Sequence, residues 1–159
     1  MFIFAARIAI MFIGEHIAKL DDKGRLVFPS PLKANATRDD GGKLTFVIKE
    51  NMHSNCLDML TIDKWKEKCE THIAKLNTDV EEEHDRVWRA FNKNTAMVEP
   101  DEKMGRILIP KWLLDKVNIS KEVVFLGCSS KIEVWAKEHY HETDIPKSEV
   151  IELMKKHLR

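Results

Sequence analysis

The stretch Leu20–Pro29 reads LDDKGRLVFP, and a variant of it returns at Glu102–Pro110 as EKMGRILIP. Both copies contain an acidic residue, a Gly-Arg pair, three apolar residues and a proline, in that order. Glycine accepts the positive φ that a tight turn requires, and an apolar triplet bounded by glycine and proline is typical of a short buried strand. The sequence therefore predicts two copies of one unit, each with a tight turn that leads into a strand.

The similarity between the two copies continues downstream. Leu57–Leu60 matches Ile132–Trp135, and the extra residues of the first copy fall in the polar stretch 37–55, where a surface loop can absorb them. We therefore expect two units of about fifty residues each. The predicted boundaries are an N-terminal extension with the start of the first strand over 1–14, a first unit over 15–63, a helical connector over 64–94, a second unit over 95–138 and a helical tail over 139–159.

The connector and the tail show helical periodicity. Apolar residues recur at three- and four-residue spacing over 62–76 and 80–92, and more weakly after Pro146, which predicts three amphipathic helices. The connector carries more apolar surface than a linker needs, so we expect it to contribute to a subunit interface. The four tryptophans lie on apolar faces and are expected to be core or subunit-contact residues: Trp65, Trp88, Trp112 and Trp135.

The composition limits the classes of function. Of 159 residues, 26 are Lys or Arg and 26 are Asp or Glu, so the formal net charge is zero. This balance excludes a globally basic coat for nucleic acid but not a local basic site. The hydrophobic content of 43% is enough for a core and argues against disorder. Cys56, Cys69 and Cys128 are widely spaced, which predicts neither a disulfide framework nor a zinc ribbon, and favours a reducing cytoplasm.

The first thirteen residues read MFIFAARIAIMFI, with a single charge at Arg7. A signal peptide would place its positive charge before the apolar run, and a membrane-spanning helix needs about 20 apolar residues. The run fits neither class. Three interpretations stay open, namely a buried first strand, a short surface anchor, or residues upstream of the true start, and we favour the last, with Met11 as the initiator. No other stretch is expected to cross a membrane.

Each repeated turn displays an arginine. Gly24 and Gly105 hold equivalent turn positions, and Arg25 and Arg106 follow them directly. The guanidinium group presents five donors in a rigid fork, which suits a pair of phosphate oxygens or the O6/N7 edge of guanine. The two turns are therefore candidate DNA-binding elements.

Charged neighbours are expected to complete these turns. Asp21 and Glu102 are the candidate partners that hold the guanidinium groups, and Lys23 and Lys103 add positive charge at the tips. A structural alternative stays open, in which each turn is only an internal clamp and its arginine is packed and paired inside the protein.

Taken in order, these motifs resemble the MraZ family. The two Gly-Arg segments are similar to its paired Asp-x-x-x-Arg motifs, and further matches are Met11–Glu15, Val124–Gly127 and Lys131–Trp135. The resemblance runs from Met11 to about residue 142. Two features depart from the pattern: Glu102 stands where the family has aspartate, although Asp101 precedes it, and residues 1–10 have no counterpart.

The resemblance implies an α+β fold of two SpoVT-AbrB-like units, interlocked as a small barrel with pseudo-twofold symmetry and flanked by helices. It also implies a transcriptional regulator, not an enzyme, associated with the nucleoid and acting at the bacterial division and cell-wall gene cluster. Its partners would be double-stranded promoter DNA with repeated boxes and further copies of itself in a ring. By motif, the DNA-facing residues would be Arg25 and Arg106. No cofactor, metal or catalytic residue is expected.

Two other classes of function compete. His139 and His141, near Glu138, Glu142 and Asp144, could form half of a metal site in a small hydrolase. The spacing of Cys69 and His72 places them on one helix, where packing explains them better than a nucleophilic pair. An AbrB-like antitoxin that binds a partner protein as well as DNA is the closer alternative.

Overall fold

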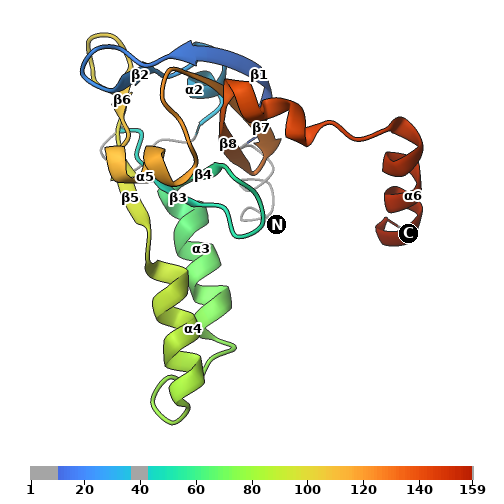
Figure 1. The fold of residues 1–159 in the computed structure, drawn as a ribbon. Helices are drawn as coiled ribbons and strands as arrows, with labels where there is room; N and C mark the ends of the chain where they lie inside the picture. Colours follow the sequence, from blue (N-terminus) through green and yellow to red (C-terminus); the bar gives the residue numbers. More distant parts are fainter. Residues whose placement is uncertain (1–10, 37–42, 159) are drawn as a thin grey trace.

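The computed structural model describes residues 11–36 and 43–158, and it confirms the predicted α+β class (Figure 1). The expectations for residues 1–10 lie outside the described residues. The described residues form eight strands: β1 (Phe12–Lys19), β2 (Arg25–Val27), β3 (Phe46–Glu50), β4 (Leu57–Thr61), β5 (Thr95–Val98), β6 (Arg106–Leu108), β7 (Glu122–Ser129) and β8 (Lys131–Ala136). The helices are α2 (Ser30–Ala34), α3 (Ile62–Ile73), α4 (Glu82–Asn92), α5 (Lys111–Lys116), the 3₁₀ helix η1 (Lys137–Thr143) and α6 (Lys147–His157).

Six strands form an antiparallel sheet in the order β1-β7-β8-β4-β3-β5. Strands β1 to β4 of the first half correspond in order to β5 to β8 of the second half. If each strand is exchanged for its counterpart, the same order is obtained in reverse. The first strand of each half pairs with the other half, because β1 lies against β7 and β5 lies against β3. At the centre, β4 pairs with β8 so that Asp58 lies opposite Glu133. The repeat in the sequence is therefore also a repeat in the pairing of the strands.

The remaining strands, β2 and β6, pair only with each other among the described residues. Leu26 lies opposite Ile107, and both side chains are fully buried. The six-stranded sheet is open, since β1 and β5 each end it and are not paired with each other. The closed barrel implied by the resemblance is therefore not formed by the described strands.

The core lies between this ribbon, the short helices and one face of the large sheet. Pro29 and Pro110 precede α2 and α5, where a fixed φ favours the first helical turn. Each short helix then buries one leucine of the repeat, Leu32 or Leu113, completely. Phe28 makes tilted and edge-on ring contacts in this core, at 5.2 Å and 5.7 Å between centroids, with Phe46 and Phe125. The repeated apolar residues thus form a single core shared by both halves.

Two elements extend from this body. Helices α3 and α4 project as a two-helix arm, and α6 stands apart at the end of the chain (Figure 1). Both arm helices lie where the apolar spacing predicts them, but neither contains a buried residue. Trp65 and Trp88 instead stack on Phe91, with ring centroids 5.1 Å and 5.4 Å away. None of the described helices is long and apolar enough to cross a membrane.

Candidate nucleic-acid interface

The exposed face of the β2–β6 ribbon carries both arginines of the repeat. Directly opposed residues, and residues two apart, share one face of a strand pair. The register therefore places Arg25, Val27, Arg106 and Leu108 on the same face. Val27 is 52% exposed and Leu108 is 60% exposed, while the opposite face is buried in the core. The ribbon presents two arginines at diagonal corners of a small aliphatic surface.

The first turn is organised by one carboxylate. Asp21 Oδ1 accepts hydrogen bonds from the backbone N–H groups of Lys23 and Arg25, each at 2.9 Å. Asp21 Oδ2 accepts from Nε of the Arg25 side chain, also at 2.9 Å. Gly24 has a φ of 78°, which favours glycine at this position, and its N–H donates to the Asp21 carbonyl. The aspartate therefore fixes both the backbone of the turn and the direction of the arginine.

The second turn repeats this network with Asp101, which corrects the expectation that Glu102 holds Arg106. Asp101 Oδ1 accepts from the N–H groups of Met104 and Arg106, at 2.8 Å and 3.3 Å, and Oδ2 accepts from Arg106 Nε at 2.9 Å. Gly105 has a φ of 66°. An ungapped alignment pairs Asp21 with Glu102, but the second turn contains one more residue between its acid and its arginine. Glu102 lies exposed in the turn itself.

Both aspartates are stabilised in the charged form. Hydrogen bonds from the backbone N–H and the side chain of Arg25 hold the pKa of Asp21 below its usual value. For Asp101, the N–H of Met104 is the largest cause, and the pKa falls to about 2. The two carboxylates are therefore ionised, and the two arginines held, throughout the physiological pH range.

Each arginine keeps donors for an outside partner. The side chains of Arg25 and Arg106 are 28% and 23% exposed. Over residues 11–36 and 43–158, their side-chain hydrogen bonds use Nε alone, which leaves the Nη nitrogens to donate to an acceptor in solution. The aspartate thus acts as an internal clamp while the end of the guanidinium still faces outward.

Lysines surround the two turns. Lys23 and Lys103 are exposed at the tips, as the sequence predicts. The structure adds Lys33, which sequence reasoning missed: its Nζ lies 4.0 Å from the position that a Cβ would take at Gly105. Lys33 belongs to α2 of the first half but borders the turn of the second half. The repeat gave no signal for it, because the matching position in the second half is Leu114.

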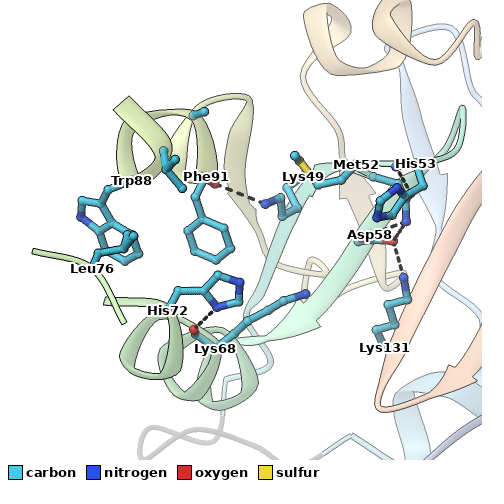
Figure 2. Close-up of a pocket in the computed structure, with 13 residues that line it drawn as sticks. Lys49, Met52, His53, Asp58, Lys68, His72, Leu76, Trp88, Phe91 and Lys131 are labelled. Atoms are coloured by element: carbon cyan, nitrogen blue, oxygen red, sulfur yellow. Dashed lines mark hydrogen bonds and ion pairs between the residues drawn. The ribbon is translucent and has the colours of Figure 1, made fainter. Parts of the chain in front are cut away.

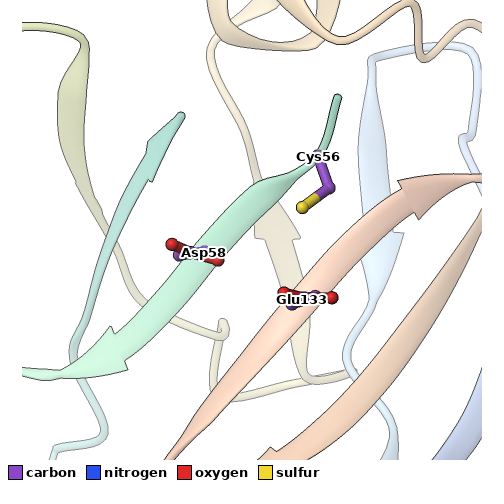
Figure 3. A group of neighbouring side chains, drawn as sticks. All are labelled: Cys56, Asp58 and Glu133. Atoms are coloured by element: carbon purple, nitrogen blue, oxygen red, sulfur yellow. The ribbon is translucent and has the colours of Figure 1, made fainter. Parts of the chain in front are cut away.

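A second charged cluster lies at the centre of the large sheet (Figure 3). Cys56, Asp58 and Glu133 each bring one potential ligand atom within 4.8 Å of the others. Lys131 Nζ lies 2.9 Å from an Asp58 oxygen and 3.3 Å from a Glu133 oxygen, so an ammonium group already provides the positive charge. Burial raises the pKa of the Cys56 thiol, with further contributions from Glu133 and Asp58, so the thiol stays protonated. This chemistry favours a structural ion network over a metal centre.

The residues of the competing hydrolase hypothesis are not brought together. His139 and His141 lie on η1, and His139 Nδ1 faces Glu142 at 3.7 Å. Of the described residues, only Cys56, Asp58 and Glu133 form a group with metal-ligand geometry. Cys69 and His72 lie on α3, where the His72 ring stacks on Phe91 at 4.5 Å and burial raises the pKa of the Cys69 thiol. His72 Nδ1 lies 2.8 Å from the backbone carbonyl oxygen of Lys68, so this ring nitrogen is engaged by the helix backbone.

Comparisons with known proteins all point to one family. A family profile described as "MraZ protein, putative antitoxin-like" matches residues 91–149. The chain is 35% identical over 145 residues to the "Transcriptional regulator MraZ" of Dictyoglomus turgidum, which covers 91% of this chain and 92% of that protein. The protein of the same name in Flavobacterium psychrophilum is 33% identical, over 82% of this chain and 80% of that protein. The one in Caldanaerobacter subterraneus subsp. tengcongensis is 32% identical, over 89% of this chain and 95% of that protein.

Proposed function

Because the chain belongs to the MraZ family, we propose that it is a DNA-binding transcriptional regulator whose β2–β6 ribbon meets the DNA. The observation that carries the proposal is the register of this ribbon, which puts Arg25 and Arg106 on one exposed face. Each arginine is oriented by an aspartate through Nε and retains free donors at its outer end.

The chemistry of this face suits duplex DNA. A two-stranded ribbon fits within the major groove, which is about 12 Å wide. The guanidinium groups then meet phosphate oxygens or guanine edges, and the exposed Lys23 and Lys103 and the half-buried Lys33 contribute charge around them. Val27 and Leu108 would face the floor of the groove, where apolar contact with thymine methyl groups is available.

A neutral chain gains little from long-range attraction to DNA, so one such face would bind weakly. We propose that a ring of identical subunits presents several copies of this face to repeated promoter boxes. Linked sites raise the apparent affinity through effective concentration. The gene cluster for cell division and cell-wall synthesis, reached on the nucleoid in the cytoplasm, is the proposed target, as the family resemblance implies.

The α3–α4 arm is the proposed contribution to the subunit interface. It has no buried residue of its own, and it leaves Ile73, Val80 and Val87 exposed. Light scattering at micromolar protein tests this assignment: the expected result is a multiple of the subunit mass. A single-subunit mass would contradict both the interface and the ring.

The DNA-binding face is tested by titrating the protein with the DNA upstream of its own operon. Replacing Arg25 by Ala should cost about 1–3 kcal/mol of binding free energy, with the fold and the oligomer unchanged. Arg86→Ala is the matched control, because Arg86 is an exposed arginine on α4, away from the ribbon, and its oligomer should have the mass of the wild type by light scattering. Equal affinities of the wild type and Arg25→Ala would show that the ribbon is not the DNA-binding face.

The matching family profile is described as antitoxin-like, which favours one alternative. In that case the same arginine turns would bind DNA while another surface holds a small toxin. Copurification of a small protein encoded next to this chain would support that function.

A further inference from the structure

A groove lies between the arm and the large sheet, away from the two arginine turns (Figure 2). One of its lining residues, Val87, also belongs to the proposed subunit interface. Its volume is about 480 Å³, within the range of pockets for small molecules. The residues that line it come from β3, β4, α3, α4, β8 and the segments next to them, and none comes from the two arginine turns.

One end of the groove is positively charged. Lys49, Lys68 and Lys131 line it, together with the carboxylate of Asp58. Lys131 is already paired with Asp58 and Glu133. For Lys49 and Lys68, by contrast, no carboxylate of the described residues lies within ion-pair distance. Two ammonium groups outside any ion pair therefore line the same cavity, although the charge of Asp58 acts on Lys49 from a greater distance.

Lys49 is the more unusual of the two, because its residue is only 5% exposed. Its Nζ donates to the backbone carbonyl of Phe91 at 3.2 Å and lies 4.3 Å from the centre of the Phe91 ring. Burial first, and then the nearby charge of Lys68, lower the pKa of Lys49. A buried cation is costly unless an opposite charge is near, and an anion between these lysines would supply that charge.

The other end of the groove is apolar. Leu76, Val87 and Trp88 line it, and Figure 2 shows Leu76 and Trp88 beyond Phe91, away from the strand residues. In the same view Lys68 extends from α3 toward Asp58 and Lys131. A ligand that fills the groove would therefore have an anionic end near the lysines and an apolar body near Trp88.

We propose that this groove binds a small phosphate monoester with an apolar or aromatic body. A monoester carries a charge of about −1.5 to −2 at neutral pH, which matches two ammonium groups better than a single carboxylate does. The phosphate would accept hydrogen bonds from Lys49 and Lys68, and the body would replace water along Leu76 and Trp88.

Calorimetry of the full-length protein tests the proposal with four probes: phenyl phosphate, benzoate, inorganic phosphate and phenol. Phenyl phosphate should bind with a stoichiometry of one per chain, and at least about tenfold more tightly than any of the other three. Binding of phenyl phosphate no tighter than that of phenol or benzoate would overturn the proposal.

Matched variants locate the binding. Lys68→Gln should weaken phenyl phosphate by about tenfold or more, whereas Lys66→Gln, which removes the same charge from an exposed position of α3, should leave it unchanged. Leu76→Ala should weaken phenyl phosphate but not inorganic phosphate. Equal losses in Lys68→Gln and Lys66→Gln would show non-specific attraction and overturn the site.

One further measurement separates this site from the DNA-binding face. Lys68→Gln should bind promoter DNA as the wild type does. If it loses DNA affinity as Arg25→Ala is expected to, while light scattering gives the oligomer of the wild type, the lysines contact the DNA backbone and the separate small-molecule site is wrong. If phenyl phosphate binds as expected and Arg25→Ala has no effect on DNA, only the DNA-binding proposal fails.

Discussion

In the first arginine turn the organising carboxylate stands four residues before its arginine, whereas in the second it stands five residues before. Despite this difference, both aspartates accept from two backbone N–H groups and from the Nε of the arginine. Both turns also place a glycine of positive φ directly before the arginine. The hydrogen-bond network is therefore repeated although the spacing is not, and the two arginines should act as equivalent donors.

The largest expected effect comes from removing both donors at once. The double variant Arg25→Ala/Arg106→Ala should bind promoter DNA at least about thirtyfold more weakly than the wild type, because each arginine contributes about 1–3 kcal/mol. Each single variant should lose about half of that binding free energy, as measured by fluorescence anisotropy with promoter DNA. If one single variant matches the double variant and the other matches the wild type, the two turns are not equivalent.

The next effect separates Asp101 from Glu102. Asp101→Ala removes three acceptor contacts and frees the Arg106 side chain, so DNA binding should weaken, though by less than in Arg106→Ala. Glu102→Ala is the matched control and should bind as the wild type does. The reverse order of affinities would restore Glu102 as the organising acid and refute the network seen in the structure.

A smaller effect is expected at the turn glycines. Gly24→Ala and Gly105→Ala place a Cβ on a left-handed backbone, which costs about 1–2 kcal/mol in the free energy of unfolding. An added Cβ at Gly24 meets no atom within 4 Å, and at Gly105 it meets only Lys33 Nζ at 4.0 Å, so strain and not collision is the cause. Denaturant unfolding should give similar losses for both. A loss at one turn alone would show that the two backbones differ.

The smallest effect is a pH dependence of stability. The pKa of Asp101 is about 2 in the folded protein, against 3.8 ordinarily, so between these values the unfolded chain binds more protons than the folded one. The Asp101 contribution is therefore complete above pH 3.8 and is lost as the pH falls toward about 2. Denaturant unfolding should show a shallower decline in this window for Asp101→Asn than for the wild type. An identical decline in both would contradict the lowered pKa.

Much of the fold was predictable because the chain repeats itself. The Gly-Arg segments, Pro29 and Pro110 predict the strands and short helices of both halves, and the three- and four-residue spacing predicts the arm. The open sheet was not predictable, because strand pairing between distant segments leaves no local pattern. Asp101 was missed because a sequence comparison without gaps cannot reveal one additional residue in a turn.

The sequence predicts the two arginines of the candidate face but not how they are arranged on it. Arg25 and Arg106 are identifiable from the repeat, yet only the register of β2 with β6 shows that they share a face with Val27 and Leu108. Lys33 at this face, and Lys49 in the groove beside the arm, each lie next to residues that are far away in the sequence. No motif marks such residues, because their surroundings are created by folding.

The most direct test of the DNA-binding ribbon is the salt dependence of promoter binding. Each phosphate contact contributes about −0.9 to the slope of log K against log salt. If both arginines of a subunit contact phosphates, Arg25→Gln/Arg106→Gln should make the slope shallower by about 1.8 for each subunit engaged. A slope unchanged from that of the wild type would show that the two turns do not meet the DNA backbone and would contradict the account.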